Sequence, residues 1–188
     1  MSADGVTNSY LIPIGDLSLA EKQSVRADAD ALLWDVCRRT LVRDNPADVI
    51  IRDAMPFTDF ALNAQEDWLI AGAGVVGTEL QYMSVLTPID HIIAFYGLAL
   101  ETTPPIISRV RFTLGATSTT VRGFFDTQAL NSRLEPAGYF SERIVFKPNE
   151  TCRIMVMPKV AWAVNTQRLV LLARVMEPIG QNVSAPSI

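Results

Sequence analysis

The chain has 188 residues, of which 49% are hydrophobic and 19% are charged, and its formal net charge at pH 7 is −4. A chain of this length fits one domain, with or without an appendage. It can bury a core large enough for the chain to fold without a disulfide or a metal. The acidic balance gives no basic footprint for binding nucleic acid. Because the charged fraction is below the norm of about 25% and the mean hydropathy is +0.22, we expect extra apolar surface that a partner or further copies of the chain cover. A large core is the alternative explanation for this apolar, charge-poor composition.

The N-terminal segment has no basic stretch followed by an apolar one, so it does not match a secretory signal. No apolar run reaches the roughly 18 residues of a membrane span, and we therefore expect no membrane contact. Cys37 and Cys152 fit no metal-binding spacing. We expect both to be free, buried thiols of a reducing compartment.

The first part of the chain is predicted to form an arm and a helix. Residues 1–17 are expected to be the arm, with an apolar patch that packs on a neighbouring subunit or on its own domain. Residues 18–46 are expected to form a helix packed on the core, in which Ser18 and Glu21 fit a capping box and Asn45-Pro46 stops the helix. Its core-facing side chains recur at helical spacing and comprise Val25, Ala29, Leu32, Leu33, Val36, Cys37 and Thr40.

Residues 47–177 are predicted to form a β-sandwich domain, because short strand-like runs alternate with turn residues at the spacing of a sandwich or barrel. The predicted strands are 49–51, 92–96, 109–114, 119–125, 143–146, 151–157, 160–164 and 168–175. Residues 178–188 are expected to be a tail. The predicted fold class is therefore mainly β: a jelly-roll-like antiparallel β-sandwich with an N-terminal arm and one amphipathic α-helix.

The segments between these strands are less uniform. Residues 53–67 are predicted to be a loop, and residues 68–86 fit either a strand or a helix. Residues 126–138 are predicted to be a longer loop with one helical turn. Lys147-Pro148-Asn149-Glu150 and Asn165-Thr166-Gln167 match the connections of β-hairpins.

The sharpest chemical motif is Gly72-Ala73-Gly74-Val75-Val76-Gly77, which has the GxGxxG spacing of dinucleotide-binding folds. On that interpretation a helix follows the motif and Glu101 binds the ribose. A glycine-rich turn or bulge is favoured instead, because the candidate helix is poor in helix formers, is cut by Pro88 and is followed only by β-patterned sequence. A small dinucleotide-binding oxidoreductase that uses Gly72 to Gly77 is kept as an alternative function.

No catalytic, cofactor-binding or metal-binding residue is assigned from the sequence. His91, the single histidine, is interpreted as a residue at the start of a strand, because triads and metal sites need more imidazoles or cysteines nearby. Three polar groups are interpreted as solvated or loop positions: Asp53, Asp59, Glu66 and Asp67; Arg109, Arg111 and Arg122; and Ser118, Thr119 and Thr120. Met155 and Met157 lie on a strand that is apolar on both faces, which favours core over a partner contact.

From Phe95 to Met157 the order of strands and turn residues resembles the β-sandwich of tailed-phage head decoration or cement proteins and of related small jelly-roll capsid subunits. The residues that carry the resemblance are Phe95-Tyr96-Gly97-Leu98, Val110-Arg111-Phe112 with Gly115, Phe124-Phe125-Asp126, Gly138-Tyr139-Phe140-Ser141, and Val145-Phe146 with Pro148. They cover about a third of the chain and include no chemical motif, so no site residues carry over. The helix at 18–42 departs from a plain jelly roll.

The resemblance implies a virion structural protein rather than an enzyme. Such a protein stabilises a capsid through contacts with the major capsid protein or with copies of itself, in homo-oligomers such as trimers. The implied location is the virion, after assembly in the host cytoplasm, and decoration, lattice-forming, tail and neck roles all stay open. A cellular β-sandwich module that binds a ligand is a further alternative.

Overall fold

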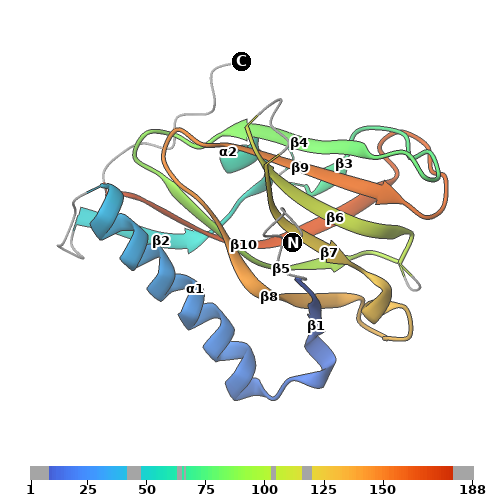
Figure 1. The fold of residues 1–188 in the computed structure, drawn as a ribbon, viewed down its shortest axis with the longest axis horizontal. Coiled ribbons are helices and arrows are strands. Elements are labelled where there is room, and N and C mark those ends of the chain that lie inside the picture. Colours follow the sequence, from blue (N-terminus) through green and yellow to red (C-terminus); the bar gives the residue numbers. More distant parts are fainter. Residues whose placement is uncertain are drawn as a thin grey trace, which may run out of the picture.

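Residues 9–41, 48–62, 65, 67–102, 105–115 and 120–179 are described by a computed structural model. They form two antiparallel sheets and one long helix (Figure 1). The order of the strands within the sheets decides which loops meet at each end of the sandwich.

Sheet 1 has the strand order β1-β8-β5-β10-β2, and the short β3 also pairs with β10. Its strands are β1 (Leu11–Pro13), β2 (Val49–Asp53), β3 (Leu69–Ile70), β5 (Ile92–Leu100), β8 (Ala137–Phe146) and β10 (Gln167–Pro178). Sheet 2 has the order β4-β9-β6-β7. Its strands are β4 (Leu80–Leu86), β6 (Ile107–Leu114), β7 (Val121–Asp126) and β9 (Thr151–Pro158).

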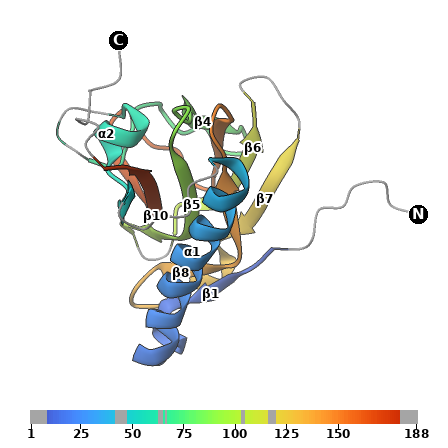
Figure 2. The ribbon, with the colours of Figure 1, turned by 90° about the vertical axis from the view of Figure 1, so that its left-hand side faces the viewer.

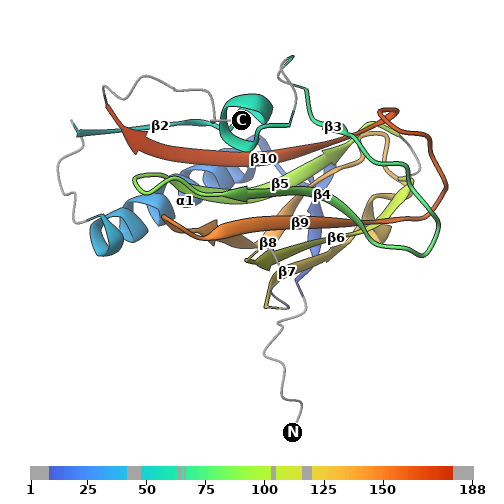
Figure 3. The same cartoon turned by 90° about the horizontal axis from the view of Figure 1, so that it is seen from above.

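The connections between the sheets make this sandwich a jelly roll. Without β1 and β3, a four-stranded sheet β8-β5-β10-β2 lies against a four-stranded sheet β4-β9-β6-β7. Successive strands change sheet at every step from β4 to β10, except between β6 and β7, which pair directly. Figure 3 shows β10, β5, β4 and β9 running along the long axis of the molecule. Eight strands in two such sheets are the jelly-roll architecture, so the predicted fold class is confirmed.

Two predicted hairpins are wrong for the same reason. β8 and β9 flank the turn at 147–150 but lie in different sheets, and β9 and β10 flank the loop at 159–166 and also lie in different sheets. Residues 160–164, predicted as a strand, contribute only an isolated bridge at Trp162. Alternating apolar residues show that a strand has a buried face but not which strand it pairs with. The pattern therefore could not separate a hairpin from a crossover.

The space between the sheets is filled by aromatic rings. Phe125 of β7 and Phe140 of β8 stack across the interior with 3.9 Å between their ring centroids, and Phe95 and Phe112 approach to 5.1 Å. Aromatic pairs of this kind add about 0.5–1.5 kcal/mol each beyond the burial of their area. Five phenylalanines are fully buried in this core: Phe95, Phe112, Phe125, Phe140 and Phe146.

Helix α1 (Leu19–Thr40) begins where the sequence predicted. The Ser18 hydroxyl accepts a hydrogen bond from the backbone N–H of Glu21, and the Glu21 carboxylate accepts one from the backbone N–H of Ser18. The capping box is therefore confirmed, and it satisfies two backbone donors that a helix start leaves unpaired. The predicted stop at Asn45-Pro46 lies outside the described residues.

The inner stripe of α1 packs on the outer face of sheet 1, as Figure 2 shows. Thr40, predicted to belong to this stripe, is exposed. The buried side chains of the helix are Ala29, Leu33, Val36 and Cys37. On the sheet they meet a second apolar cluster that includes Val49, Ile92, Ala94 and Met176.

The arm packs on its own domain over the part that the structure describes. β1 pairs with β8 in the register Leu11 to Phe140, and the Leu11 side chain is buried in the core. Gly138 leaves room for it, because a Cβ there would lie 3.3 Å from the Leu11 Cβ. The 3-10 turn η1 (Ile14–Asp16) follows, and Asp16 pairs with Arg133 at 2.6 Å. Residues 1–8 and the end of the predicted tail, 180–188, lie outside the described residues.

Two short helical elements lie in regions predicted as loops. α2 (Pro56–Phe60) interrupts the predicted loop 53–67, and Phe60 is buried against Phe95 with 5.7 Å between ring centroids. Five residues are too few to show helical periodicity, so this helix was missed. η3 (Gln128–Leu130) provides the predicted helical turn between β7 and β8.

Candidate functional site

The glycine motif lies at one end of the sandwich, which we call the loop end. The loop end comprises the β3–β4 loop, residues 71–79, and the β9–β10 loop, residues 159–166 (Figure 3). Gly74 and Trp162 join the two loops, because the Gly74 N–H donates to the Trp162 carbonyl at 3.0 Å and the Trp162 N–H donates to the Gly74 carbonyl at 3.2 Å. The Trp162 indole N–H also donates to the Gly72 carbonyl at 3.1 Å.

Each glycine of the motif has a structural reason. A Cβ on Gly74 would lie 2.4 Å from the Trp162 ring atom Cδ2, and one on Gly72 would lie 2.6 Å from Leu80 Cδ1. Gly77 has a φ of +75°, a conformation that other residues rarely adopt. The first two glycines therefore make room for neighbouring side chains, and the third allows the turn into β4.

The structure does not form the unit that a dinucleotide-binding motif requires. Strand β4 follows Gly77 where a helix was needed, and the described sheets are antiparallel rather than parallel. Glu101, the proposed ribose ligand, pairs with Arg168 at 3.1 Å. The favoured interpretation of a turn in which two backbones approach closely is confirmed for Gly74.

Four exposed valines cover the loop end, and we call them the apolar tip. They are Val75 and Val76 on the β3–β4 loop and Val160 and Val164 on the β9–β10 loop, each more than half exposed. The alanines between them are exposed as well: Ala71, Ala73, Ala161 and Ala163. Because the bridge at Trp162 fixes both loops, the apolar tip is a defined surface in the folded chain.

The sequence pattern did not identify the apolar tip. Residues 160–164 were predicted to be a strand, and the valines of the glycine motif were considered only in relation to dinucleotide binding. One signal was available, since residues 71–77 are all glycine, alanine or valine and residues 160–164 are alanine and valine around one tryptophan. Such a composition is unusual for loops, which are commonly rich in Asn, Asp, Ser and Pro.

His91 belongs to an ion-pair cluster at the start of β5. Arg52 donates to both carboxylate oxygens of Asp59, at 2.8 and 2.7 Å, and to both oxygens of Glu177, at 2.9 and 2.8 Å. His91 Nε2 lies 3.2 Å from Glu177 Oε2, and His91 Nδ1 lies 2.8 Å from Asp90 Oδ1. The position of His91 directly before β5 agrees with its interpretation as a residue at the start of a strand.

The charged groups of this cluster stabilise one another, as the pKa shifts of Arg52 and Glu177 show. The hydrogen bond to Asp59 is the largest influence that raises the pKa of Arg52, and the hydrogen bonds from Arg52 hold the pKa of Glu177 below its usual range. The Asp59 side chain is 4% exposed, so its interpretation as solvated is wrong. The cluster joins β2, α2 and β10 through charge-assisted hydrogen bonds.

The remaining loop carboxylates are also paired where they are described. Asp53 binds Arg174 at 2.8 Å and Arg26 at 3.0 Å, and Asp67 binds Arg168 at 2.8 Å. Glu66 lies outside the described residues. A sequence pattern places such carboxylates in a loop but does not show which basic strand residues face that loop.

The arginines of β6 and β7 lie on the outer face of sheet 2. Arg111 pairs with Glu79, and Arg122 pairs with Glu150 at 3.0 Å. The Arg109 guanidinium lies 4.5 Å from the centroid of the Phe124 ring, a cation–π distance. These contacts within the chain explain a basic strand face without a nucleic-acid partner. Ser118 and Thr119 lie outside the described residues.

The sulfur-containing residues complete the predicted candidates. Met155 is 9% exposed and Met157 is half-buried, both on β9. Cys37 and Cys152 are buried thiols, as predicted, and burial raises the pKa of the Cys152 thiol. Among the described residues no group of three His, Cys, Asp or Glu side chains could hold a metal ion. No helix in the described ranges is long and apolar enough to cross a membrane.

Comparison of the chain with protein families, curated proteins and solved structures found no match.

Proposed function

We propose that this chain is a virion structural protein, a capsid decoration, cement or minor capsid protein that stabilises the shell through contacts with the major capsid protein or with copies of itself. The observation that carries the proposal is the eight-stranded jelly roll with an interior packed with apolar side chains. Jelly rolls occur in viral capsid, lectin and cupin domains. Because the interior of this jelly roll is packed with side chains, we expect its outer surfaces to perform its function.

Contacts within the chain occupy the outer faces of the two sheets, which favours the loop end as the surface that meets other subunits. Helix α1 covers the outer face of sheet 1, and β1 extends the edge of that sheet beside β8. On the outer face of sheet 2, Arg111 and Arg122 pair with carboxylates of the same chain, and Arg109 lies over the Phe124 ring. The apolar tip has no such covering within the described residues, and burial of its side chains stabilises a complex by about 25 cal/mol per Å².

The apolar tip also fits the bulk composition. A charge-poor chain with high mean hydropathy is expected to cover apolar surface by association, and the valines of the tip are a place where that surface is concentrated. β-Branched side chains lose little conformational freedom when they are buried. A rigid, apolar contact of this kind suits a lattice in which each subunit holds one fixed position.

Sedimentation tests this proposal directly. The native source lysate is sedimented through a sucrose gradient and the chain is followed by mass spectrometry. We expect it to travel with megadalton particles. Recovery only at the top of the gradient, as a monomer or small oligomer, overturns the proposal.

Variants of the apolar tip locate the contact. Val76→Asp and Val164→Asp place a charge on an exposed loop and are expected to reduce incorporation into particles while leaving the fold intact. Ile89→Asp is the matched control, because Ile89 is 70% exposed in the β4–β5 connection, at the other end of the sandwich. Equal incorporation of all three variants would exclude the apolar tip as the contact surface.

A further inference from the structure

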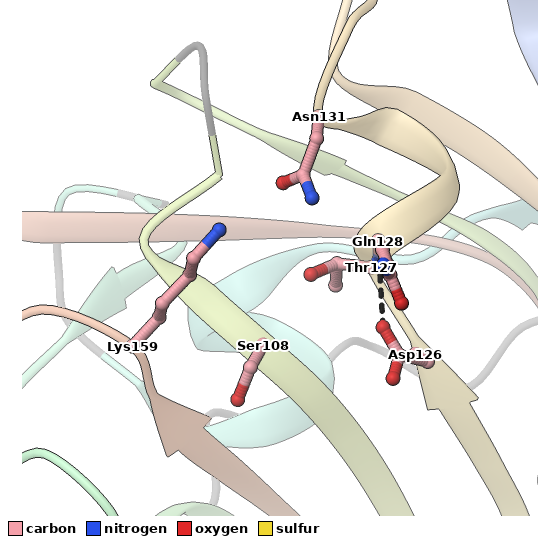
Figure 4. Close-up of a pocket in the computed structure, with 6 residues that line it drawn as sticks. All are labelled: Ser108, Asp126, Thr127, Gln128, Asn131 and Lys159. Atoms are coloured by element: carbon pink, nitrogen blue, oxygen red, sulfur yellow. Dashed lines mark hydrogen bonds between the residues drawn. The ribbon is translucent and has the colours of Figure 1, made fainter.

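A pocket of about 270 Å³ opens near the loop end (Figure 4). Four segments build it: the start of β6, the end of β7, the turn at η3 and the beginning of the β9–β10 loop. Figure 4 shows Lys159 on one side of the pocket and Asp126 with Gln128 on the other. The side chains that line it are all polar: Ser108, Asp126, Thr127, Gln128, Asn131 and Lys159.

The two hydroxyl groups of the pocket can only accept hydrogen bonds from a ligand. Ser108 Oγ donates its proton to the Met157 carbonyl at 3.0 Å, and Thr127 Oγ1 donates its proton to the Ile107 carbonyl. A hydroxyl has one proton and two lone pairs. Both oxygens therefore keep free lone pairs, and Thr127 is 1% exposed, so its position is fixed.

The charged residues of the pocket are held by the fold as well. The Asp126 carboxylate accepts a hydrogen bond from the Gln128 backbone N–H at 2.7 Å through Oδ1, so Oδ2 is the oxygen available to a ligand. The Lys159 backbone N–H donates to the Ile106 carbonyl at 2.7 Å. The backbone at both charged residues is therefore held before a ligand enters, which limits the entropy lost on binding.

Lys159 and Asp126 line the same pocket without pairing. No ion pair joins them, and within the described residues no carboxylate pairs with Lys159, whereas Arg111 of β6 pairs with Glu79 and Arg122 of β7 pairs with Glu150. Two opposite charges that line one pocket without pairing leave space for a ligand that carries a partner group for each of them.

We propose that this pocket binds an acidic sugar, a single ring that carries a carboxylate and hydroxyl groups. Its carboxylate accepts hydrogen bonds from the Lys159 ammonium, and its hydroxyls donate to Asp126 and to the free lone pair of Ser108, while the buried Thr127 forms the floor of the pocket. The side-chain amides of Gln128 and Asn131 supply both donors and acceptors for the remaining hydroxyls. The volume, just under the roughly 300–1,000 Å³ of drug-sized sites, admits one ring.

Simpler ligands match only half of the pocket. A small carboxylate would pair with Lys159 but would give no hydrogen bond to Asp126 Oδ2. A neutral sugar would satisfy Asp126 and leave the ammonium without an acceptor. This site does not depend on the proposed virion role, because its chemistry is the same on any jelly roll.

The test is an NMR titration of the full ¹⁵N-labelled chain with three probes. Glucuronate carries both groups, glucose carries the hydroxyls, and propionate carries the carboxylate. We expect glucuronate to shift the backbone amides of 106–108, 126–131 and 159, with an affinity at least about tenfold above either other probe, which corresponds to about 1.4 kcal/mol.

Two variants and one control complete the test. Lys159→Gln and Asp126→Asn are each expected to weaken glucuronate binding about tenfold or more, and Asp126→Asn retains an oxygen that can accept from the Gln128 N–H. Lys147→Gln, which removes an exposed lysine from the β8–β9 turn at the opposite end, is expected to bind as the natural chain does. Absence of shifts at millimolar glucuronate, shifts outside the pocket, or equal affinity for all three probes overturns the proposal.

Discussion

The backbones of Gly74 and Trp162 exchange two hydrogen bonds, and the indole ring lies where a side chain on Gly74 would have to be. This pair joins two loops that are far apart in the sequence. The bridge converts the β3–β4 and β9–β10 loops into one surface and carries the apolar tip. Its removal should therefore affect both stability and the proposed contact.

Gly74→Ala tests the bridge. The added Cβ would lie 2.4 Å from the tryptophan ring, so one of the two loops must move, and we expect a loss of about 1–3 kcal/mol in the free energy of unfolding. Urea denaturation followed by tryptophan fluorescence measures this loss. Gly15→Ala is the control, because a Cβ at Gly15 has no heavy atom within 4 Å. A similar effect of both substitutions would contradict the close approach at Gly74.

Arg174→Ala tests how α1 is held on sheet 1. The Arg174 side chain is 9% exposed and donates to Asp30 of the helix at 2.7 Å and to Asp53 of β2 at 2.8 Å. Hydrogen bonds between charged groups contribute about 1.5–3 kcal/mol, and we expect a destabilisation in that range by urea denaturation.

The control for this prediction is Arg39→Ala. Arg39 pairs with Asp35 on the exposed face of the same helix and is 74% exposed, so its loss should cost about 0.5 kcal/mol or less. If both arginine variants unfold at the same urea concentration, Arg174 does not hold the helix on the sheet.

Glu177 should make stability depend on pH in the acid range. Hydrogen bonds from Arg52 lower the pKa of Glu177 from its ordinary value of 4.5. A carboxyl whose folded pKa is lowered contributes stability that is fully present above its unfolded pKa and is lost as the pH falls through the folded pKa. We therefore expect Glu177→Gln to be less stable than the natural chain near neutral pH, with the difference shrinking below pH 4.5.

The measurement is the free energy of unfolding in urea at a series of pH values for both chains. Glu135→Gln, at an exposed position in the β7–β8 connection, controls for the loss of a surface charge. A difference between the natural chain and Glu177→Gln that stays constant with pH would argue against the ion pair with Arg52.

Local signals in the sequence predicted the local elements well. The capping box of Ser18 and Glu21 fixed the start of α1, and the alternation of Arg109 and Arg111 with Val110 and Phe112 located β6. These features depend on residues that are neighbours along the chain. Their physical causes, a capped helix start and a strand with one buried face, act over a few residues.

Long-range pairing was not accessible in the same way. Trp162 meets Gly74 across the end of the sandwich. Each partner alone has an ordinary local explanation, as a strand residue or a turn glycine. Only the order of the strands in the two sheets brings them together, and apolar periodicity does not encode that order.

The position of β10 in sheet 1 affects how the protein folds during its synthesis. β10 is the last strand of the described residues, yet β5, β2 and β3 all pair with it. During synthesis these earlier strands leave the ribosome before the strand that joins them exists. Sheet 1 can therefore form only after residues 167–178 have left the ribosome. A nascent chain that stops before that point exposes the edges of β2 and β5, and it depends on the cell to keep these edges from aggregating.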